Sequence, residues 1–349
     1  MSRKLLCLSA TTALMGGTAM ADVPRVAVDI APVHSLVARV MEGVGTPDLI
    51  VQPGASPHEY SLRPSEAAAL QEADLVVWMG AGLTPWMEGA VATLAEDAAV
   101  MTLLEADGTV LLDFREGALF EAHSHDDGDH DDHDHEGDHD HDHDDHAHDH
   151  DDHDHDHADH AEGDDHDHDH DHGHEGHDHG AHDPHAWLSI ENAGTWLNLI
   201  AAQLSAADPE NAGAYFANAA AAGEEMEALS ADIAAMLEPV RGGSFIAFHD
   251  AYQYFETDFA FPASGAISLS DATDPSPARI AEIQARIAEE GIDCVLAEPQ
   301  FNPGIVAAVL DGTEAKTGVI DPLGADLAPG PDLYPQVLRN MATTLVGCL

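Results

Sequence analysis

Apolar runs and amphipathic segments alternate through the first part of the chain. The run Asp74–Met79 is apolar after its first residue and is followed by a glycine, which is typical of a buried parallel strand. Helices are predicted where apolar residues recur every three or four positions, or where proline stands in the first turn. The predicted elements are strand Arg25–Ile30, helix Ser35–Glu42, strand Asp48–Gln52, helix Pro64–Glu72 and strand Asp74–Met79.

The same alternation returns near the C-terminus. Strands are predicted at Ser244–Phe248, Asp293–Ala297 and Thr317–Ile320, with a helix at Pro277–Glu290. Strands that alternate with helices favour parallel sheets covered by helices. The fold class is therefore α/β, with two α/β domains that each contain a parallel sheet.

An alanine-rich segment, Pro209–Leu237, lies between these two regions and contains no internal proline. Asp208 is a natural N-cap, and Pro239 would end the helix. A helix of this length spans about 40 Å and would serve as a rigid connector along both domains. The alternative is two helices broken at Gly223, because glycine costs ~1 kcal/mol inside a helix. We expect domains at 22–207 and 240–349, joined by a connector over 208–239.

The composition is strongly acidic, with 66 Asp and Glu against 11 Lys and Arg and a formal charge of −55. Such a chain lacks the basic face that a nucleic-acid-binding protein needs. A block over 123–182 holds 23 of the 27 histidines and 26 acidic residues. It should be disordered without a ligand, because it lacks the residues that build a core. A solvated acidic loop would explain the aspartates, but so many imidazoles indicate metal binding.

The N-terminus has the features of a cleavable export signal over residues 1–21. Arg3 and Lys4 precede an apolar stretch, and Ala19-Met20-Ala21 is an A-x-A cleavage site. A membrane anchor is the alternative, but the apolar stretch is short and broken by glycines. The exported chain keeps Cys294 and Cys348, for which an oxidising compartment favours a disulfide over two separate buried thiols.

Four histidines lie outside the block: His34, His58, His185 and His249. The last three lie at or near the ends of predicted strands, as does Asp321, and ligands bind at the carboxyl ends of strands in open α/β sheets. His34 stands at the start of a helix, where capping or solvent exposure is expected. Asp250 and Glu298 are candidate acceptors for the second N–H of a ligating imidazole. Trp187, Tyr252 and Phe301 are expected in the core or the cleft wall.

Five motifs occur in one order along the chain: G-A-S-P-H-E-Y-S-L-R-P-S-E, H-A-W-L-S, F-I-A-F-H-D-A-Y-Q-Y-F-E, A-E-P-Q-F and I-D-P-L-G. Together they resemble the periplasmic zinc-binding protein of high-affinity zinc-uptake ABC transporters, the ZnuA type of metal-binding solute-binding proteins. The resemblance covers essentially all of the chain after the signal. It implies a monomeric periplasmic protein that passes Zn²⁺ to a permease and its cytoplasmic ATPase.

The resemblance also implies a ligand set in a cleft between the domains. The implied ligands are His58, His185 and His249. Asp321 would be either the fourth ligand or an oxygen acceptor that contacts one of the ligands. It further implies the connector helix, the His-rich insertion before His185 and the Cys294–Cys348 bridge. One departure is Pro57, where some relatives carry an acidic residue. A carboxylate from that position is unavailable, although Glu59 lies nearby.

Donor chemistry independently favours zinc. Three imidazoles with one carboxylate or water suit tetrahedral Zn²⁺, whereas Mn²⁺ and Fe²⁺ prefer more oxygen ligands. Cu²⁺ would also bind such donors tightly. A metallohydrolase and a metal buffer or adhesin without a transporter are the alternative functions. No H-E-x-x-H or G-x-S-x-G motif accompanies the histidines, so a transport protein rather than an enzyme is expected.

Overall fold

The computed structural model describes residues 23–115, 117, 120, 182–268 and 275–349. The predicted signal over 1–21 and the His/Asp-rich block, except His182, lie outside these residues. The first part contains β1 (Val26–Val28), α1 (Ala31–Val40), β2 (Asp48–Leu49), α2 (Pro64–Glu72), β3 (Leu75–Trp78), α3 (Pro85–Leu94), β4 (Ala99–Thr102) and the 3-10 turn η1 (Leu103–Glu105).

The remaining elements follow the block. In chain order they are η2 (Ala186–Leu188), α4 (Ile190–Ala207), α5 (Ala212–Leu237), η3 (Glu238–Val240), β5 (Phe245–His249), α6 (Gln253–Phe259), β6 (Gly265–Ser268), α7 (Pro277–Glu290), β7 (Cys294–Ala297), α8 (Pro303–Leu310), β8 (Lys316–Val319) and α9 (Leu333–Cys348). None of the helices in the described ranges is long and apolar enough to span a bilayer.

The strands form two parallel four-stranded sheets with the same topology. Their orders are β2-β1-β3-β4 and β6-β5-β7-β8. This confirms the predicted parallel α/β fold. In each sheet the first strand, β1 or β5, lies between the second and the third. The chain therefore adds the second strand on one side of it and the third strand on the other side. The carboxyl ends of strands at such a switch point are where α/β sheets bind ligands.

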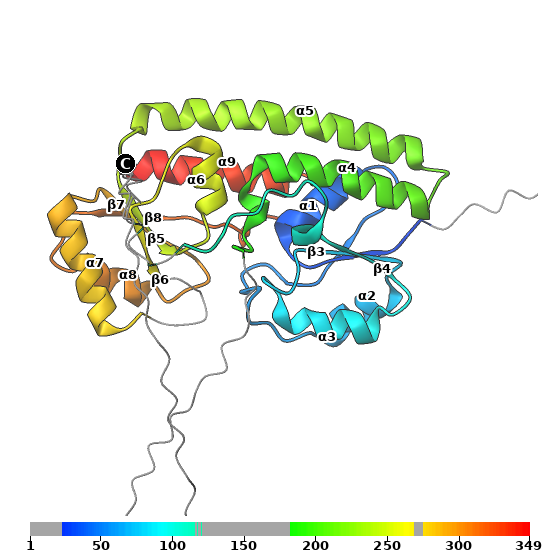
Figure 1. Ribbon diagram of the computed structural model, residues 1–349, viewed down its shortest axis with the longest axis horizontal. Coiled ribbons are helices and arrows are strands. Elements are labelled where there is room, and N and C mark those ends of the chain that lie inside the picture. The colour runs from blue at the N-terminus through cyan, green and yellow to red at the C-terminus, as the bar shows by residue number, and fades with distance from the viewer. Residues whose placement is uncertain (1–22, 116, 118–119, 121–181, 269–274) are drawn as a thin grey trace, which may run out of the picture. The chain divides into compact units, whose positions relative to one another are not determined.

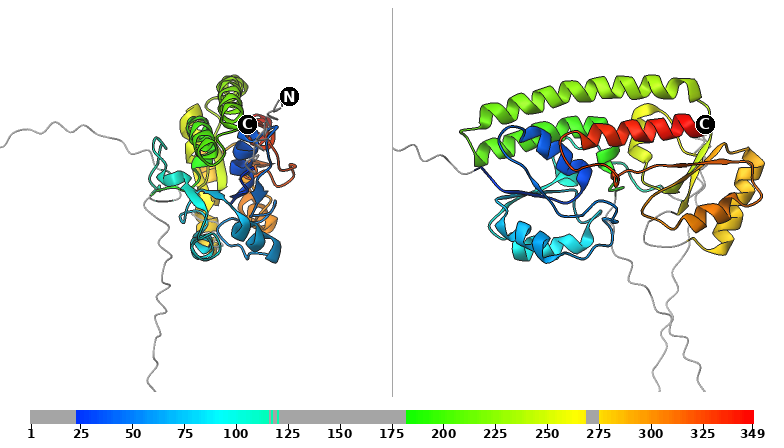
Figure 2. Two further views of the ribbon diagram at one scale, coloured as in Figure 1. Left: turned by 90° about the vertical axis from the view of Figure 1, so that its right-hand side faces the viewer. Right: turned by 180° about the vertical axis from the view of Figure 1, so that it is seen from behind.

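Alternate residues of the strands face two different cores. In β1, Val26 and Val28 join a large cluster with α1, α4, α5 and α9, whereas Ala27 packs against α2 and α3. In β5, Phe245 joins the large cluster and Ile246 packs under α7 and α8. The large cluster includes residues of both sheets, so a shared layer of helices joins them (Figures 1 and 2).

The long helix α5 is continuous through Gly223, which confirms the predicted connector and excludes the broken alternative. It packs on α4, α1 and α9 (Figure 1). Its start was predicted three residues too early. Asn211 is the N-cap, and the Asp208 carboxylate instead accepts hydrogen bonds from the Asn211 amide and the Tyr215 hydroxyl. The division into domains at 207/208 and 239/240 stays a prediction.

Cys294 at the start of β7 and Cys348 at the end of α9 form a disulfide. The bridge predicted from the even number of exported cysteines is therefore confirmed. The bridge holds α9 against β7 of the second sheet. The two cysteines are 54 residues apart in the sequence.

Candidate metal centre

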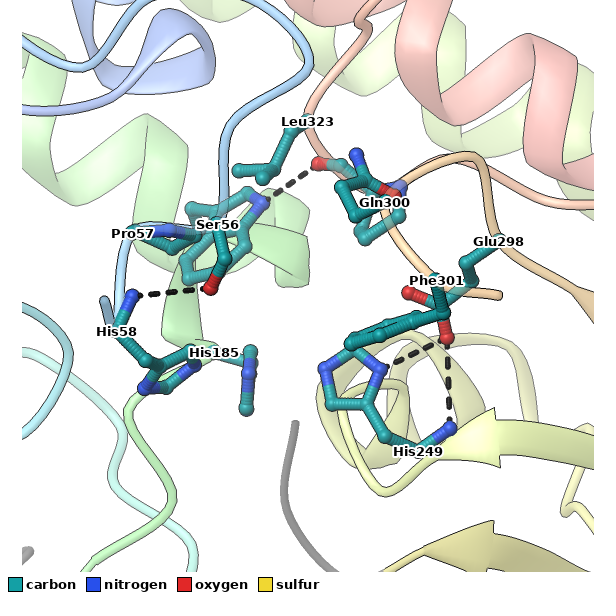
Figure 3. A pocket seen from close by; sticks show the side chains of 11 residues that line it. Ser56, Pro57, His58, His185, His249, Glu298, Gln300, Phe301 and Leu323 are labelled. Carbon is teal, nitrogen blue, oxygen red and sulfur yellow. Dashed lines mark hydrogen bonds and ion pairs between the residues drawn. The ribbon is translucent and has the colours of Figure 1, made fainter. Parts of the chain in front are cut away.

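A small pocket brings together the three histidines that the sequence predicted. Its lining includes His58 from the loop after β2, His185 just before η2 and His249 at the end of β5 (Figure 3). Glu298, Gln300 and Phe301 from the loop after β7 complete one wall. Residues far apart in the sequence thus meet at one place, as the ends of parallel strands allow.

The three imidazole rings are close to one another. The His185 ring centroid lies 5.5 Å from that of His58 and 5.3 Å from that of His249. Imidazoles on one tetrahedral zinc, with Zn–N bonds of about 2.0–2.1 Å, place their centroids roughly 5 Å apart. Within the described ranges, however, no three His, Cys, Asp or Glu side chains already stand in an arrangement that could hold a metal ion.

A buried carboxylate orients the His185 ring. Oδ1 of Asp183 lies 2.7 Å from His185 Nδ1 and accepts a hydrogen bond of 2.9 Å from the His185 amide. Asp183 is 2% exposed, and burial raises its pKa to about 7 although the His185 amide opposes that rise. With Nδ1 engaged by the carboxylate, Nε2 is the atom that His185 can offer to a metal.

His249 is oriented in the same way by Glu298, whose Oε1 lies 2.7 Å from Nδ1 and 3.4 Å from the His249 amide nitrogen (Figure 3). Phe301 stands edge-on to the His249 ring at 5.3 Å and stacks on Phe248 at 4.3 Å. Glu298 therefore takes the predicted role of imidazole acceptor. Carboxylate–imidazole pairs of this kind are typical of metal sites, because they fix the tautomer and raise the basicity of the ring.

His58 lies in a different setting, on a turn-rich loop after β2. It is partly buried, and its amide donates to Ser56 Oγ at 3.3 Å. The Trp86 indole N–H donates to the Pro57 carbonyl at 2.7 Å, which ties this loop to α3. Glu59 next to it is exposed. The loop is thus held through its backbone next to His58.

Asp321 follows β8 and does not line the pocket. Its Oδ1 accepts hydrogen bonds from Gln300 Nε2 at 3.1 Å and from the amides of Leu323 and Gly324 at 3.0 Å. The carboxylate thus organises the turn that carries the pocket residues Pro322 and Leu323. Its role as a metal ligand stays a prediction, because it would have to exchange these bonds for the metal.

Two other expectations need correction. His34 is neither a cap nor exposed: it is buried within α1, and its Nε2 lies 3.1 Å from the Pro47 carbonyl. Asp250 is bound to Arg115 instead of an imidazole. Trp187, Tyr252 and Phe301 pack in the core or the pocket wall as expected.

Sequence reasoning missed Asp183 and Arg115. Asp183 stands two residues before His185 in D-P-H, and the proline between them was the one available signal that the two side chains turn toward each other. Arg115 is one of only 11 basic residues in the chain. The small number of basic residues could have drawn attention to Arg115. Its partners could not be inferred, because Asp250 and Glu256 lie far away in the sequence.

Comparison with known proteins places the chain in one family. The family described as "ZnuA: Zinc-uptake complex component A periplasmic" matches residues 26–348. The high-affinity zinc uptake system protein ZnuA of Brucella abortus (strain 2308) is 48% identical over 324 residues, which cover 93% of this chain and 91% of that protein.

Two further matches agree. The protein of the same name from Paracoccus denitrificans (strain Pd 1222) is 44% identical over 345 residues, which cover 99% of this chain and 97% of that protein. A crystal structure of ZnuA superposes with a TM-score of 0.67 at 20% identity, covering 94% of this chain and 99% of that one, and supports the fold. The chain belongs to the ZnuA family of periplasmic zinc-uptake components.

Proposed function

We propose that this protein captures Zn²⁺ through Nε2 of His58, His185 and His249 and delivers it to the permease of an ABC importer. The observation that carries the proposal is the pair of carboxylate–imidazole contacts, Asp183 with His185 and Glu298 with His249. Both acids are almost fully buried. Buried carboxylates that each hold one imidazole nitrogen leave the other nitrogen directed for metal binding.

The three histidines lie on segments that are held to different degrees. His185 and His249 sit on segments that are fixed by buried hydrogen bonds, whereas His58 comes from a partly exposed loop. We infer that His58 moves onto the metal that the other two imidazoles hold. Asp321 or a water molecule would supply the fourth donor, since tetrahedral zinc accepts either.

Three nitrogen donors favour zinc over the oxygen-seeking divalent ions Mn²⁺ and Mg²⁺. Neutral imidazoles are required, so metal binding releases protons wherever the rings were protonated. The donor set alone gives no preference over Cu²⁺. Family membership favours transport over the metallohydrolase alternative.

The remaining parts of the proposal concern regions outside the pocket. Residues 1–21 direct export to the periplasm, and the His/Asp-rich loop over 123–182 recruits or buffers zinc for the pocket. Domains over 22–207 and 240–349, joined by the connector over 208–239, flank the site in a monomeric protein. The permease in the inner membrane, with its cytoplasmic ATPase, is the partner that receives the ion.

Zinc titration tests this function on two forms of the exported chain, one intact and one without residues 123–182. Both forms should keep one tight site, and the deletion should remove several weaker sites. His249→Ala should abolish the tight site in both forms, whereas His34→Ala, which changes a buried histidine outside the pocket, should preserve it. Loss of the tight site on deletion, with the rest of the chain folded, would place capture in the loop and refute the proposal.

A further inference from the structure

Arg115 belongs to the first part of the chain, but its side chain binds two acidic residues next to the pocket, Asp250 and Glu256. Its side chain is largely buried, at 18% exposure. Nε donates to both carboxylate oxygens of Asp250 at 3.0 and 3.1 Å, and Nη2 also bonds to Asp250. Nη1 and Nη2 donate to the two oxygens of Glu256 at 2.8 and 2.9 Å. One guanidinium thus binds two buried carboxylates at once.

These two carboxylates lie on either side of the corner between β5 and α6. Asp250 directly follows His249, and Glu256 lies within α6. Glu256 also accepts a hydrogen bond from the Ala263 amide at 3.0 Å, which ties the corner to the chain that leads into β6. Through these bonds Arg115 fixes the backbone that carries His249.

The same corner also supports His185. The Tyr254 hydroxyl in α6 donates to the Asp183 carbonyl at 2.8 Å and accepts from the Leu112 amide at 3.0 Å. Leu112 lies three residues before Arg115, so one short segment contacts α6 at two places. Asp183, whose side chain orients His185, is therefore tied through its backbone carbonyl to the helix that Arg115 binds.

Charge explains why an arginine is needed here. Asp250 and Glu256 are 9% and 6% exposed, and a buried carboxylate without a counter-charge is strongly unfavourable. Arginine presents a planar fork of donors that can grip two carboxylates, which lysine cannot do. Phe120 lies 3.6 Å from the guanidinium, measured to its ring centroid, and restricts the side chain further.

We propose that Arg115 is a positioning residue for zinc capture: by bridging Asp250 and Glu256 it keeps His249 and Asp183 in the places where they serve the pocket. The inference rests on the proposed ligand set. Without the guanidinium, the two acids would turn toward water and displace the corner between β5 and α6. His249 would then shift relative to Glu298 and to the rest of the pocket, although every proposed ligand is still present.

The test compares four variants of the exported chain: Arg115→Ala, Arg115→Lys, His249→Ala and Arg339→Ala. Arg339 is the matched control, because it pairs with Asp232 at the surface, away from the pocket. Zinc affinity of the tightest site is measured by competition with a chelator. The visible absorption of the first equivalent of Co²⁺ reports the coordination geometry, and thermal unfolding of the metal-free proteins reports stability.

Arg115→Ala should weaken the tightest zinc site by about 10–100-fold, the usual cost of losing an outer support of a metal site. Its Co²⁺ spectrum should change, Arg115→Lys should recover part of the affinity, and Arg339→Ala should match the parent. An Arg115→Ala protein with parental affinity and spectrum, whatever its thermal stability, would overturn the inference. If Arg115→Ala does not fold, Arg115→Lys decides: a lysine variant with parental zinc affinity and a parental Co²⁺ spectrum would overturn the inference.

The His249→Ala variant separates the two proposals. If it keeps the parental affinity, the ligand set itself is wrong. If it loses affinity while the Arg115 variants do not, the ligand set stands and only the role of Arg115 fails.

Discussion

The two sheets have the same strand order, yet they use their switch points differently. In the first sheet, the Asp29 carboxylate after β1 accepts a hydrogen bond of 2.7 Å from the Met79 amide after β3. In the second sheet, Glu298 after β7 reaches the His249 amide and ring at the end of β5. A buried carboxylate thus links the first and third strands of each sheet. Asp29 accepts hydrogen bonds from backbone amides, whereas Glu298 also orients the imidazole of His249 at the pocket.

The comparison shows how one architecture serves both stability and function. A carboxylate that accepts only backbone N–H groups closes the end of the sheet. The same bridge with a histidine as its partner turns that position into a support for the proposed metal ligand His249. The first sheet instead contributes to the pocket through His58, from the loop after its edge strand β2.

The sharpest test of this contrast exchanges the orienting carboxylates for amides. Glu298→Gln and Asp183→Asn should each weaken the tight zinc site by about 10–100-fold, because the amide holds the imidazole less firmly and does not raise its basicity. Zinc affinity is measured by chelator competition, with Glu314→Gln, on the exposed loop before β8 and outside the pocket, as control. An unchanged affinity in both amide variants would show that the carboxylate–imidazole contacts do not support capture.

A smaller loss is expected for Asp321→Ala. Its carboxylate organises the turn over 322–325, and water can replace an oxygen ligand. We expect a drop in zinc affinity smaller than that of His249→Ala, measured by calorimetry under the same conditions. A loss as large as that of His249→Ala would instead identify Asp321 as an essential ligand.

Asp29→Asn should leave zinc affinity unchanged and alter the pH dependence of stability. Burial raises the pKa of Asp29 to about 7, against hydrogen bonds from the Met79 and Ile30 amides. Its contribution to stability is therefore fully present below the unfolded pKa of 3.8 and is lost as the pH rises through about 7. At about 1.36 kcal/mol per pKa unit, the loss is at most roughly 4 kcal/mol.

Urea unfolding of the metal-free parent and the Asp29→Asn variant between pH 4 and pH 8 measures this difference. The stability of the parent relative to the variant should fall across that range. A constant difference would mean that Asp29 keeps the same protonation state in the folded and unfolded chains.

Reduction of the Cys294–Cys348 disulfide should also leave zinc affinity unchanged. The bridge spans 54 residues, for which the chain-entropy model gives a stabilisation of about 4 kcal/mol. We expect a lower thermal midpoint after reduction, with zinc affinity retained, since neither sulfur lies at the pocket. A reduced protein that loses the tight site while it stays folded would link the contact between α9 and the inner strand β7 to the pocket.

Local patterns in the sequence were sufficient for much of the fold. Helices α2 and α7 have the predicted bounds, because proline at the first turn and periodic apolar residues mark them clearly. The edge strands β4 and β6 were not predicted, since their short sequences carry weak patterns and are set by pairing with distant strands.

The site was predictable to the extent that its chemistry is rare. Few histidines remain outside the block, so three of them could be proposed as ligands from their places in the sequence, and all three line one pocket. Of their supports, Glu298 was predicted as an imidazole acceptor, and it contacts His249. Arg115 was not predicted, because Arg115 and Asp250 stand 135 positions apart and meet only in the folded chain. Adjacency to His249 made Asp250 a candidate acceptor, but the arginine takes it.

Anomalous scattering at the zinc edge, from crystals of the exported chain grown with one equivalent of Zn²⁺, tests the central claim most directly. The strongest peak should lie within about 2.0–2.1 Å of Nε2 of His58, His185 and His249. Asp183 and Glu298 should still hold the Nδ1 atoms of His185 and His249. A strongest peak bound by other donors, with these three imidazoles left without the metal, would contradict the account.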